Sequence, residues 1–141
     1  MAIQRRIPMR HGDVFPHGAY LIDEFAPVGD YDAARRPDGS RPQATDQETG
    51  LPVWSVAVID ADPEAGKNNK SVNVKVSAKV QPVPPENKSG TPFTLVEFSG
   101  ITATPWIDDS GPGDRGRLAW SIRATGVAAP GQGAKPEKAA A

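Results

Sequence analysis

The strictest pattern in the chain is an alternation of apolar and polar residues over positions 71–80. The apolar positions are Val72, Val74, Val76, Ala78 and Val80, and the polar positions between them are Asn73, Lys75, Ser77 and Lys79. Successive side chains of a β-strand point to opposite faces, so this period of two predicts a strand. One face of the strand meets a core, and the other carries the two lysines.

Four other segments have the pattern of strands. Residues 51–59 are mostly apolar on both faces and predict a more buried strand. Residues 20–26 alternate imperfectly and stop at Pro27, and residues 91–104 change their inward face near Gly100, which predicts a bulge or a sharp bend. Residues 117–123 alternate, with Leu118, Trp120 and Ile122 inward and Arg117, Ala119, Ser121 and Arg123 outward.

Residues that break regular structure separate these segments. The chain has 14 glycines and 15 prolines among 141 residues, well above the roughly 12% of an average protein. This excludes a helical bundle and a coiled coil. Five strands, one of them bent, predict an all-β fold: a small five-stranded antiparallel barrel like the OB-fold, with long loops. The alternative is a β-sandwich, which usually needs seven strands.

We expect three regions in the chain. Residues 1–13 are a flexible N-terminal segment, residues 14–125 a single barrel domain, and residues 126–141 a disordered tail rich in Ala, Gly, Pro and Lys. The start is basic but lacks the apolar stretch of a signal peptide, and no run approaches the length that spans a bilayer. The expected location is therefore cytoplasmic.

Few residues suggest chemistry. Cysteine is absent, so thiolate metal sites and disulfides are excluded. His11, Asp13 and His17 are a weak ligand set that we interpret as a polar lead-in to the first strand. Asp108, Asp109 and Asp114 lack the spacing of a calcium loop and are interpreted as acids of a surface turn. We therefore expect no metal, no cofactor and no enzymatic activity.

One motif match is misleading. Residues 111–116, GPGDRG, fit the glycine pattern of dinucleotide-binding proteins. That pattern must open a helix, because the helix N-terminus holds the pyrophosphate. Here a predicted strand follows, so the segment is interpreted as a tight hairpin connection.

A binding surface is more plausible than a catalytic site. Lys75 and Lys79 share the outer face of one predicted strand, and Arg117 and Arg123 that of another. Trp106, beside Pro105, is expected to be exposed, whereas Trp54 and Trp120 lie on apolar faces and are expected in the core. Basic grooves with aromatic platforms bind single-stranded nucleic acid, although outward lysines also serve solubility and protect sheet edges.

Charge limits this hypothesis. The formal net charge is −1, so attraction to nucleic acid requires a locally basic surface. The loop 30–49 adds three candidate cations, Arg35, Arg36 and Arg41, which stand among acids that include Asp32, Asp38, Asp46 and Glu48. A structureless loop of this length is unusual in a compact domain and is often functional.

Several strings resemble a known family. They are PVGDYDAARRPDGSRPQATDQETGLPVW at 27–54, DADPEA at 60–65, KVQPVPP at 79–85 and LAW at 118–120. They are similar to small actinobacterial proteins of conjugative plasmids and integrative elements, the plasmid replication, integration and excision activators. The resemblance spans about residues 14–124 and carries over no catalytic residues. It implies a cytoplasmic accessory factor of a mobile genetic element.

Two functions follow as hypotheses. The first is a non-enzymatic accessory protein that promotes replication, integration or excision through single-stranded nucleic-acid binding by an OB-like barrel. The alternative is an activator that contacts an element-encoded initiator, recombinase or repressor through an exposed strand edge or apolar patch, without binding nucleic acid. A promoter-binding β-ribbon is a weaker third possibility, and the oligomeric state is left open.

Overall fold

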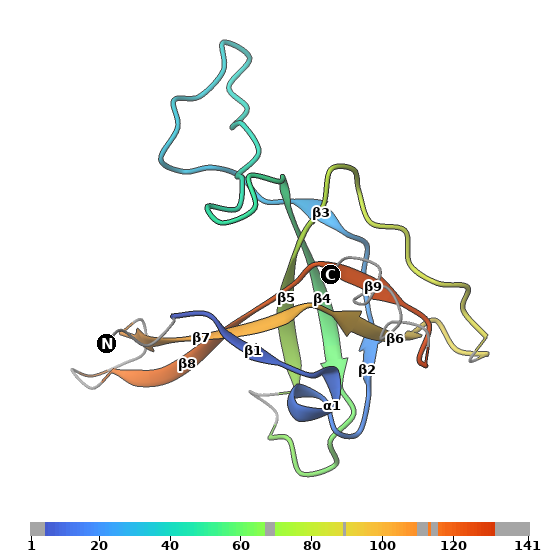
Figure 1. The fold of residues 1–141 in the computed structure, drawn as a ribbon. Helices are drawn as coiled ribbons and strands as arrows, with labels where there is room; N and C mark the ends of the chain where they lie inside the picture. The colour runs from blue at the N-terminus through green and yellow to red at the C-terminus, as the bar shows by residue number, and fades with distance from the viewer. Residues whose placement is uncertain (1–4, 67–69, 89, 110–112, 114–115, 132–141) are drawn as a thin grey trace.

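The computed structural model describes residues 5–66, 70–88, 90–109, 113 and 116–131, and Figure 1 shows them as a strongly curved sheet with one helical turn. The elements in chain order are β1 (Ile7–Met9), α1 (His11–Val14), β2 (Ala19–Leu21), β3 (Ala26–Pro27), β4 (Val53–Asp60), β5 (Ser71–Ser77), β6 (Thr94–Ser99), β7 (Ile101–Asp108), β8 (Arg117–Ala124) and β9 (Gly126–Ala128). Among the described residues, no helix is long and apolar enough to cross a membrane.

All nine strands belong to one mixed sheet that is curled into a half-barrel. Its order is β1-β7-β8-β5-β4-β2-β6-β9, with β3 beside β4. Neighbouring strands are antiparallel except for β5 and β8, which run parallel through Val74–Ile122, Lys75–Arg123 and Val76–Ala124. The all-β prediction is confirmed, and a single sheet replaces the alternative of two packed sheets.

The expected closed five-stranded antiparallel barrel is wrong. The five predicted segments all contain strands, but β1 and β9, each three residues long, lie outside them. Strands this short show no periodicity, so the sequence did not predict these two. The parallel ladder was also missed, because alternation within one strand carries no information about the direction of its neighbour.

The chain bends at Gly100, between β6 and β7. Ser99 pairs with Gly126, and Thr102 pairs with Arg123, so the register continues unchanged from the β6–β9 ladder into the β7–β8 ladder. Gly100 has φ +63°, and a Cβ atom there would collide with the side chain of Thr125. The predicted bend is therefore confirmed. It lets one half of a long hairpin pair with β2 and the other half with β1.

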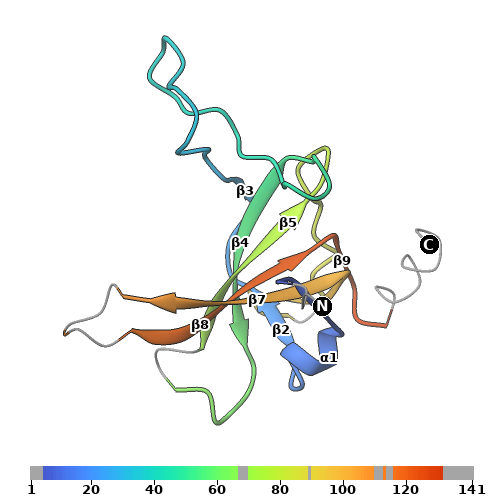
Figure 2. The ribbon, with the colours of Figure 1, turned by 60° about the vertical axis from the view of Figure 1, so that its left-hand side comes forward.

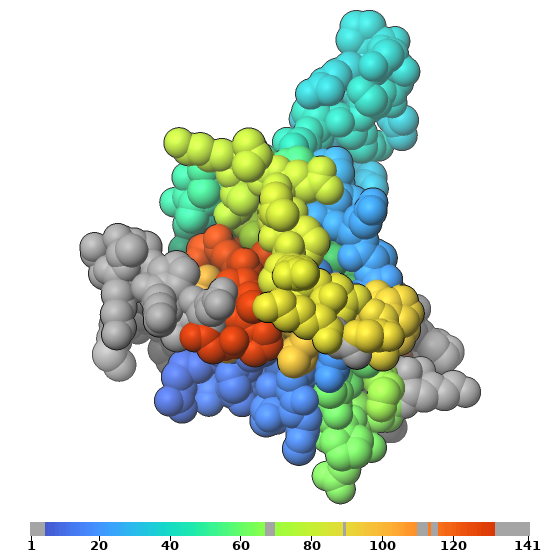
Figure 3. All heavy atoms as spheres, turned by 90° about the vertical axis from the view of Figure 1, so that its right-hand side faces the viewer, coloured from blue at the N-terminus to red at the C-terminus, as the bar shows by residue number. Residues whose placement is uncertain are grey.

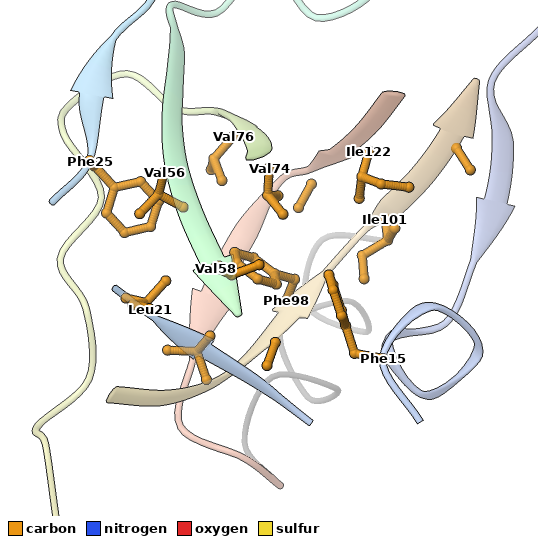
Figure 4. Packing of buried hydrophobic residues seen from close by; sticks show 14 residues of the cluster. Phe15, Leu21, Phe25, Val56, Val58, Val74, Val76, Phe98, Ile101 and Ile122 are labelled. Atoms are coloured by element: carbon orange, nitrogen blue, oxygen red, sulfur yellow. The ribbon is translucent and has the colours of Figure 1, made fainter. Parts of the chain in front are cut away.

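The core lies on the inner face of the curved sheet, as Figure 4 shows. Its largest fully buried side chains are Phe98, Val56, Val58, Val74, Val76 and Val96. The alternation over 71–80 thus places its valines in the core at positions 74 and 76. The strand ends earlier than predicted, at Ser77, and Val80 is 73% exposed. Past that end, the carbonyl of Ala78 accepts a hydrogen bond from Trp54 Nε1 at 3.0 Å.

Two regions extend from this body. Figures 1 and 2 show the distal half of the β7–β8 hairpin, residues 104–108 and 117–121, leaving the half-barrel. We call this ribbon the arm. Residues 29–45 form a second projection, the 29–45 loop, which stands off the body in Figure 3. A bridge between Gly29 and Gln43 and a hydrogen bond from Asp30 N to Pro42 O at 2.8 Å close its base.

The chain ends lie only partly within the described residues. Residues 1–13 were expected to be flexible, and within them residues 7–9 form β1 and residues 11–13 begin α1. Residues 126–141 were expected to be disordered, and within them Gly126–Ala128 form β9. Residues 1–4 and 132–141 lie outside the described part of the chain.

Candidate nucleic-acid interface

The strand registers place four predicted site residues on one face of the sheet. Lys75 pairs with Arg123 across the parallel ladder, and Trp106 pairs with Ala119 across the β7–β8 ladder. Alternation along β8 puts Arg117, Ala119, Ser121 and Arg123 on the same side. This side is opposite to the core side chains Val74 and Ile122. We call it the outer face.

Two cations lie side by side at the centre of the outer face. Lys75 and Arg123 are both half-buried. Burial and the neighbouring Arg123 lower the pKa of Lys75. Burial and the nearby Arg6 lower the pKa of Arg123, although Asp46 and Glu48 oppose that effect. Like charges on adjacent strands disfavour each other, so an anion bound between Lys75 and Arg123 would relieve their repulsion.

The buried carboxylate of Asp46 lies beside these cations and binds Arg6. Both Nη1 contacts of Arg6 to the Asp46 carboxylate are 2.9 Å, and Ser77 Oγ donates to Asp46 Oδ2 at 3.0 Å. The Arg123 guanidinium lies 3.8 Å from the same oxygen. Burial alone would raise the pKa of Asp46, but hydrogen bonds from the Glu48 amide, Arg6 and Ser77 outweigh burial and lower the pKa to about 2. Asp46 is therefore ionised and fixes the turn over 44–50.

An open groove of about 1530 Å³ extends over these residues. The turn over 44–48 and β5 line part of it, and both sides of the arm line another part, including Leu118 and Trp120 of the inner side. The segment before β1, the end of α1 and the two ends of β4 complete the lining. Its charged lining residues are the cations Arg5, Arg6, Lys75, Arg117 and Arg123 and the acids Asp46, Glu48, Asp60 and Asp108. The charge of the groove is thus nearly balanced. Attraction to an anion would depend on the few cations whose positions the sheet fixes.

The tryptophans divide differently from the prediction. Trp106 is 48% exposed on the outer face, which confirms its expected exposure. Trp120 is 49% exposed and Leu118 62% exposed, so their predicted place in the core is wrong. Both do point to the core side of β8. They lie in the arm, beyond the body, where their side of the sheet is not packed as closely as it is in the body.

The remaining predicted cations lie elsewhere. Lys79 lies past the end of β5 and is exposed, and it does not line the groove. Arg35, Arg36 and Arg41 belong to the 29–45 loop, which extends away from the sheet in Figures 1 and 2. Within that loop the Arg41 guanidinium lies 4.5 Å from the centre of the Tyr31 ring, and Arg35 Nη1 donates to Gly39 O at 3.0 Å.

Sequence reasoning missed Arg6 and Asp46. Arg6 falls in the segment expected to be flexible, and Asp46 was one of several acids in the 30–49 loop. Forty positions separate the two residues, and no local pattern links them. A long loop with one acid followed two and three residues later by Glu48 and Thr49 was the available signal, because such spacing suits a turn in which the acid caps amides.

The three possible metal ligands, His11, Asp13 and His17, each contact other residues. His11 Nδ1 accepts a hydrogen bond from the Phe98 amide at 3.0 Å, and burial lowers the pKa of His11 while Glu97 opposes that shift. Asp13 pairs with Arg10, and His17 lies 3.8 Å from Asp62. Within the described residues, no three His, Asp or Glu side chains gather as a metal site would require. Asp114 and most of the 111–116 motif lie outside them.

Comparison with protein-family models, curated proteins and solved structures found no match. The resemblance to replication, integration and excision activators therefore stays a prediction.

Proposed function

We propose that this protein is a non-enzymatic binding module that holds a single-stranded nucleic acid in the groove over β5 and β8. The observation that carries the proposal is the Lys75–Arg123 pair, which shares the outer face with the exposed indole of Trp106. Backbone phosphates would contact the cations, and a base would stack on Trp106. Stacking of this kind contributes about 1–3 kcal/mol per base.

The strand order supports an OB-like assignment of the half-barrel. OB-folds are partly open five-stranded barrels that bind oligonucleotides on the face of strands 2 and 3, flanked by the loops between strands 1 and 2 and between strands 4 and 5. We take β2 as the first of these five OB strands, β4 as the second, β5 as the third, the β6–β7 run as the fourth and the β8–β9 run as the fifth. The binding face of an OB-fold, on its second and third strands, then corresponds to β4 and β5. The connection before β4, residues 28–52, then corresponds to one flanking loop, and its residues 44–48 line the groove together with residues of β5.

The biological role within this proposal is that of an accessory factor. Binding of a single strand suits a protein that assists replication, integration or excision of a mobile element, which is the role the family resemblance implies. The proposed role requires no catalytic step. It requires only that the phosphates of a strand contact the fixed cations and that a base stacks on the flat aromatic surface of the groove.

The first test measures the anisotropy of a labelled oligothymidylate at low salt with two pairs of matched variants. Lys75→Gln and Lys79→Gln remove the same charge, one inside the groove and one outside it. Lys75→Gln should weaken binding about 5-fold or more and reduce the salt slope by about 0.7, the value for one phosphate contact on a single strand. Lys79→Gln should change binding less than 2-fold.

The second pair compares an aromatic residue of the groove with one outside it. Trp106→Ala should weaken binding about 5-fold or more, because it removes the stacking surface, while Tyr31→Ala, which removes an exposed ring of the 29–45 loop outside the groove, should leave affinity unchanged. Melting temperatures of all four variants separate lost binding from lost folding. No binding by the wild type at 50 mM salt, or equal losses for both members of a pair, would overturn the proposed function.

A further inference from the structure

A histidine of α1 completes the hydrogen bonding at the edge of β6. The ladder between β2 and β6 ends at the pair Ala19–Val96, two residues before Phe98. The Phe98 amide lies beyond that ladder, and it donates to His11 Nδ1 at 3.0 Å. An imidazole nitrogen thus takes the place that a carbonyl group of a neighbouring strand has within a ladder.

The His11 ring is also packed against two buried rings of the core. Its centre lies 5.4 Å from that of Phe15 and 6.1 Å from that of Phe98, and the two phenylalanine rings are 6.3 Å apart. Phe15 and Phe98 are each 2% exposed, and Figure 4 shows Phe15 reaching from the end of α1 into the core. A positive charge on the His11 ring would lose part of its hydration in this place.

The charged groups around α1 leave the neutral form of His11 favoured. Burial lowers the pKa of His11, and the carboxylate of Glu97, on β6, opposes that shift without cancelling it. The other charged side chains of α1 and of the segment after it contact partners of their own: Arg10 lies 3.2 Å from Asp13, and His17 lies 3.8 Å from Asp62.

Contacts at three places hold residues 5–15, which we call the strap, to the rest of the described chain. Arg6 binds Asp46 and Glu48 at 2.9 and 3.0 Å, at the edge of the groove. β1 pairs with residues 101–103 of β7. At the far end of the strap, His11 and Phe15 hold α1 against β6 and the core.

We propose that the contact between His11 and Phe98 is a pH-sensitive latch, which holds α1 on β6 at neutral pH and releases it in mild acid. The neutral ring accepts the Phe98 amide through the lone pair of Nδ1, so its own proton is on Nε2. A second proton goes to Nδ1 and turns the acceptor into a donor, which faces the Phe98 amide without a bond. The Arg6 ion pairs and the β1 ladder contain no histidine and keep their contacts.

The direction of the pH effect follows from the lowered pKa. His11 in the open form has its ordinary pKa of 6.5, so the open form binds the proton more tightly than the closed form. The latch is therefore fully closed above about pH 6.5 and weakens as the pH falls below that value. Between pH 7.5 and pH 5 the opening equilibrium rises by at most about 30-fold, the limit for a group that titrates at 6.5 only when open.

The first experiment follows amide hydrogen exchange by NMR at pH 7.5 and pH 5, corrected for the intrinsic exchange rate at each pH. The amides of Phe98 and Phe15 both bond to His11, and their protection should fall at least about 5-fold at pH 5. Amides of the β4–β5 ladder report global unfolding, and their protection should change less than about 2-fold. An equal loss in that ladder, or unchanged protection at Phe98, overturns the latch.

Matched variants of the two histidines separate the latch from general effects of acid. His11→Asn places a carboxamide oxygen on the same γ-carbon that carries Nδ1, so an acceptor remains that does not titrate. The Phe98 amide of this variant should stay protected at both pH values. His17→Asn removes the other histidine of the chain and should keep the full response. A His11→Asn protein that responds to acid like the wild type, or a His17→Asn protein that does not respond, contradicts the latch.

Chemical shifts of the wild type give a readout that needs no variant. The His11 ring should titrate below pH 6.5, and the Phe98 amide proton should shift with the same midpoint, because protonation of Nδ1 breaks its hydrogen bond. A His11 ring that titrates at or above 6.5, or a Phe98 amide that does not follow the ring, overturns the proposal.

Discussion

The two halves of the β7–β8 hairpin have the same alternation but opposite fates. In the body, Ala103, Ile122 and Ala124 are buried against the valines of β4 and β5. In the arm, Ile107, Leu118 and Trp120 occupy equivalent positions of the same strands and face solvent. The difference is the presence of neighbouring strands, since β1 and β5 stop where the arm begins. Alternation therefore fixes which side a residue faces, and the remote parts of the chain decide whether that side is covered.

The largest effect should separate body from arm by stability. Phe98→Ala removes a fully buried ring and should lower the free energy of unfolding by about 3–5 kcal/mol. Trp120→Ala removes a larger side chain from the arm and should cost less than about 1 kcal/mol. Chemical denaturation of both variants measures the difference. Comparable losses would show that the arm is packed as the body is.

A smaller effect is expected where body and arm meet, at Gly100. Gly100→Ala forces an L-residue into φ +63° and brings its Cβ onto Thr125, so we expect a loss of at least about 2 kcal/mol. Gly39→Ala is the control, because φ is +89° there and a Cβ meets no atom within 4 Å. It should cost about 1 kcal/mol from backbone strain alone.

Equal losses of stability in the two glycine variants would show that the contact with Thr125 does not constrain the bend. A second control measures Gly100→Ala in a Thr125→Ala background. In that background most of the excess cost of Gly100→Ala should disappear, because Oγ1 and Cγ2 are removed and only the Cβ atom of residue 125, 3.1 Å away, remains.

The smallest of the three effects concerns the buried acid that ties the 44–50 turn to the body. The folded pKa of Asp46, about 2, lies below its ordinary value of 3.8. A carboxyl with a lowered folded pKa stabilises the fold above its unfolded pKa, and this contribution disappears as the pH falls through the folded value. About 2 kcal/mol should therefore be lost between pH 4 and pH 2.

Asp46→Asn should remove most of this acid limb from a plot of stability against pH. Asp13→Asn is the matched control on the exposed Arg10–Asp13 pair, and it should keep the limb. An Asp46→Asn protein with the acid profile of the wild type would show that other carboxyls cause it.

The sequence predicted the strands better than their assembly. Apolar patterns, alternating or continuous, located the five predicted segments, and Gly100 revealed the bend because few other residues accept its backbone conformation. The short strands and the Val74–Ile122 ladder depend on contacts between distant positions, which a local pattern does not encode. The same limit applies to the site. Arg117 and Arg123 were correctly assigned to one face, whereas the pairing of Lys75 with Arg123 across the ladder and the contact of Arg6 with Asp46 required the folded chain.

The parallel ladder between β5 and β8 also imposes an order on folding. It joins Val74 to Ile122, 48 positions further along the chain, whereas β4–β5 and β7–β8 are hairpins of near neighbours. Closing a long loop costs entropy before its contacts repay it. We therefore expect the two hairpins to form early and their docking along Lys75 and Arg123 to be the slow step. The cation pair at the centre of the groove would then be assembled late in folding.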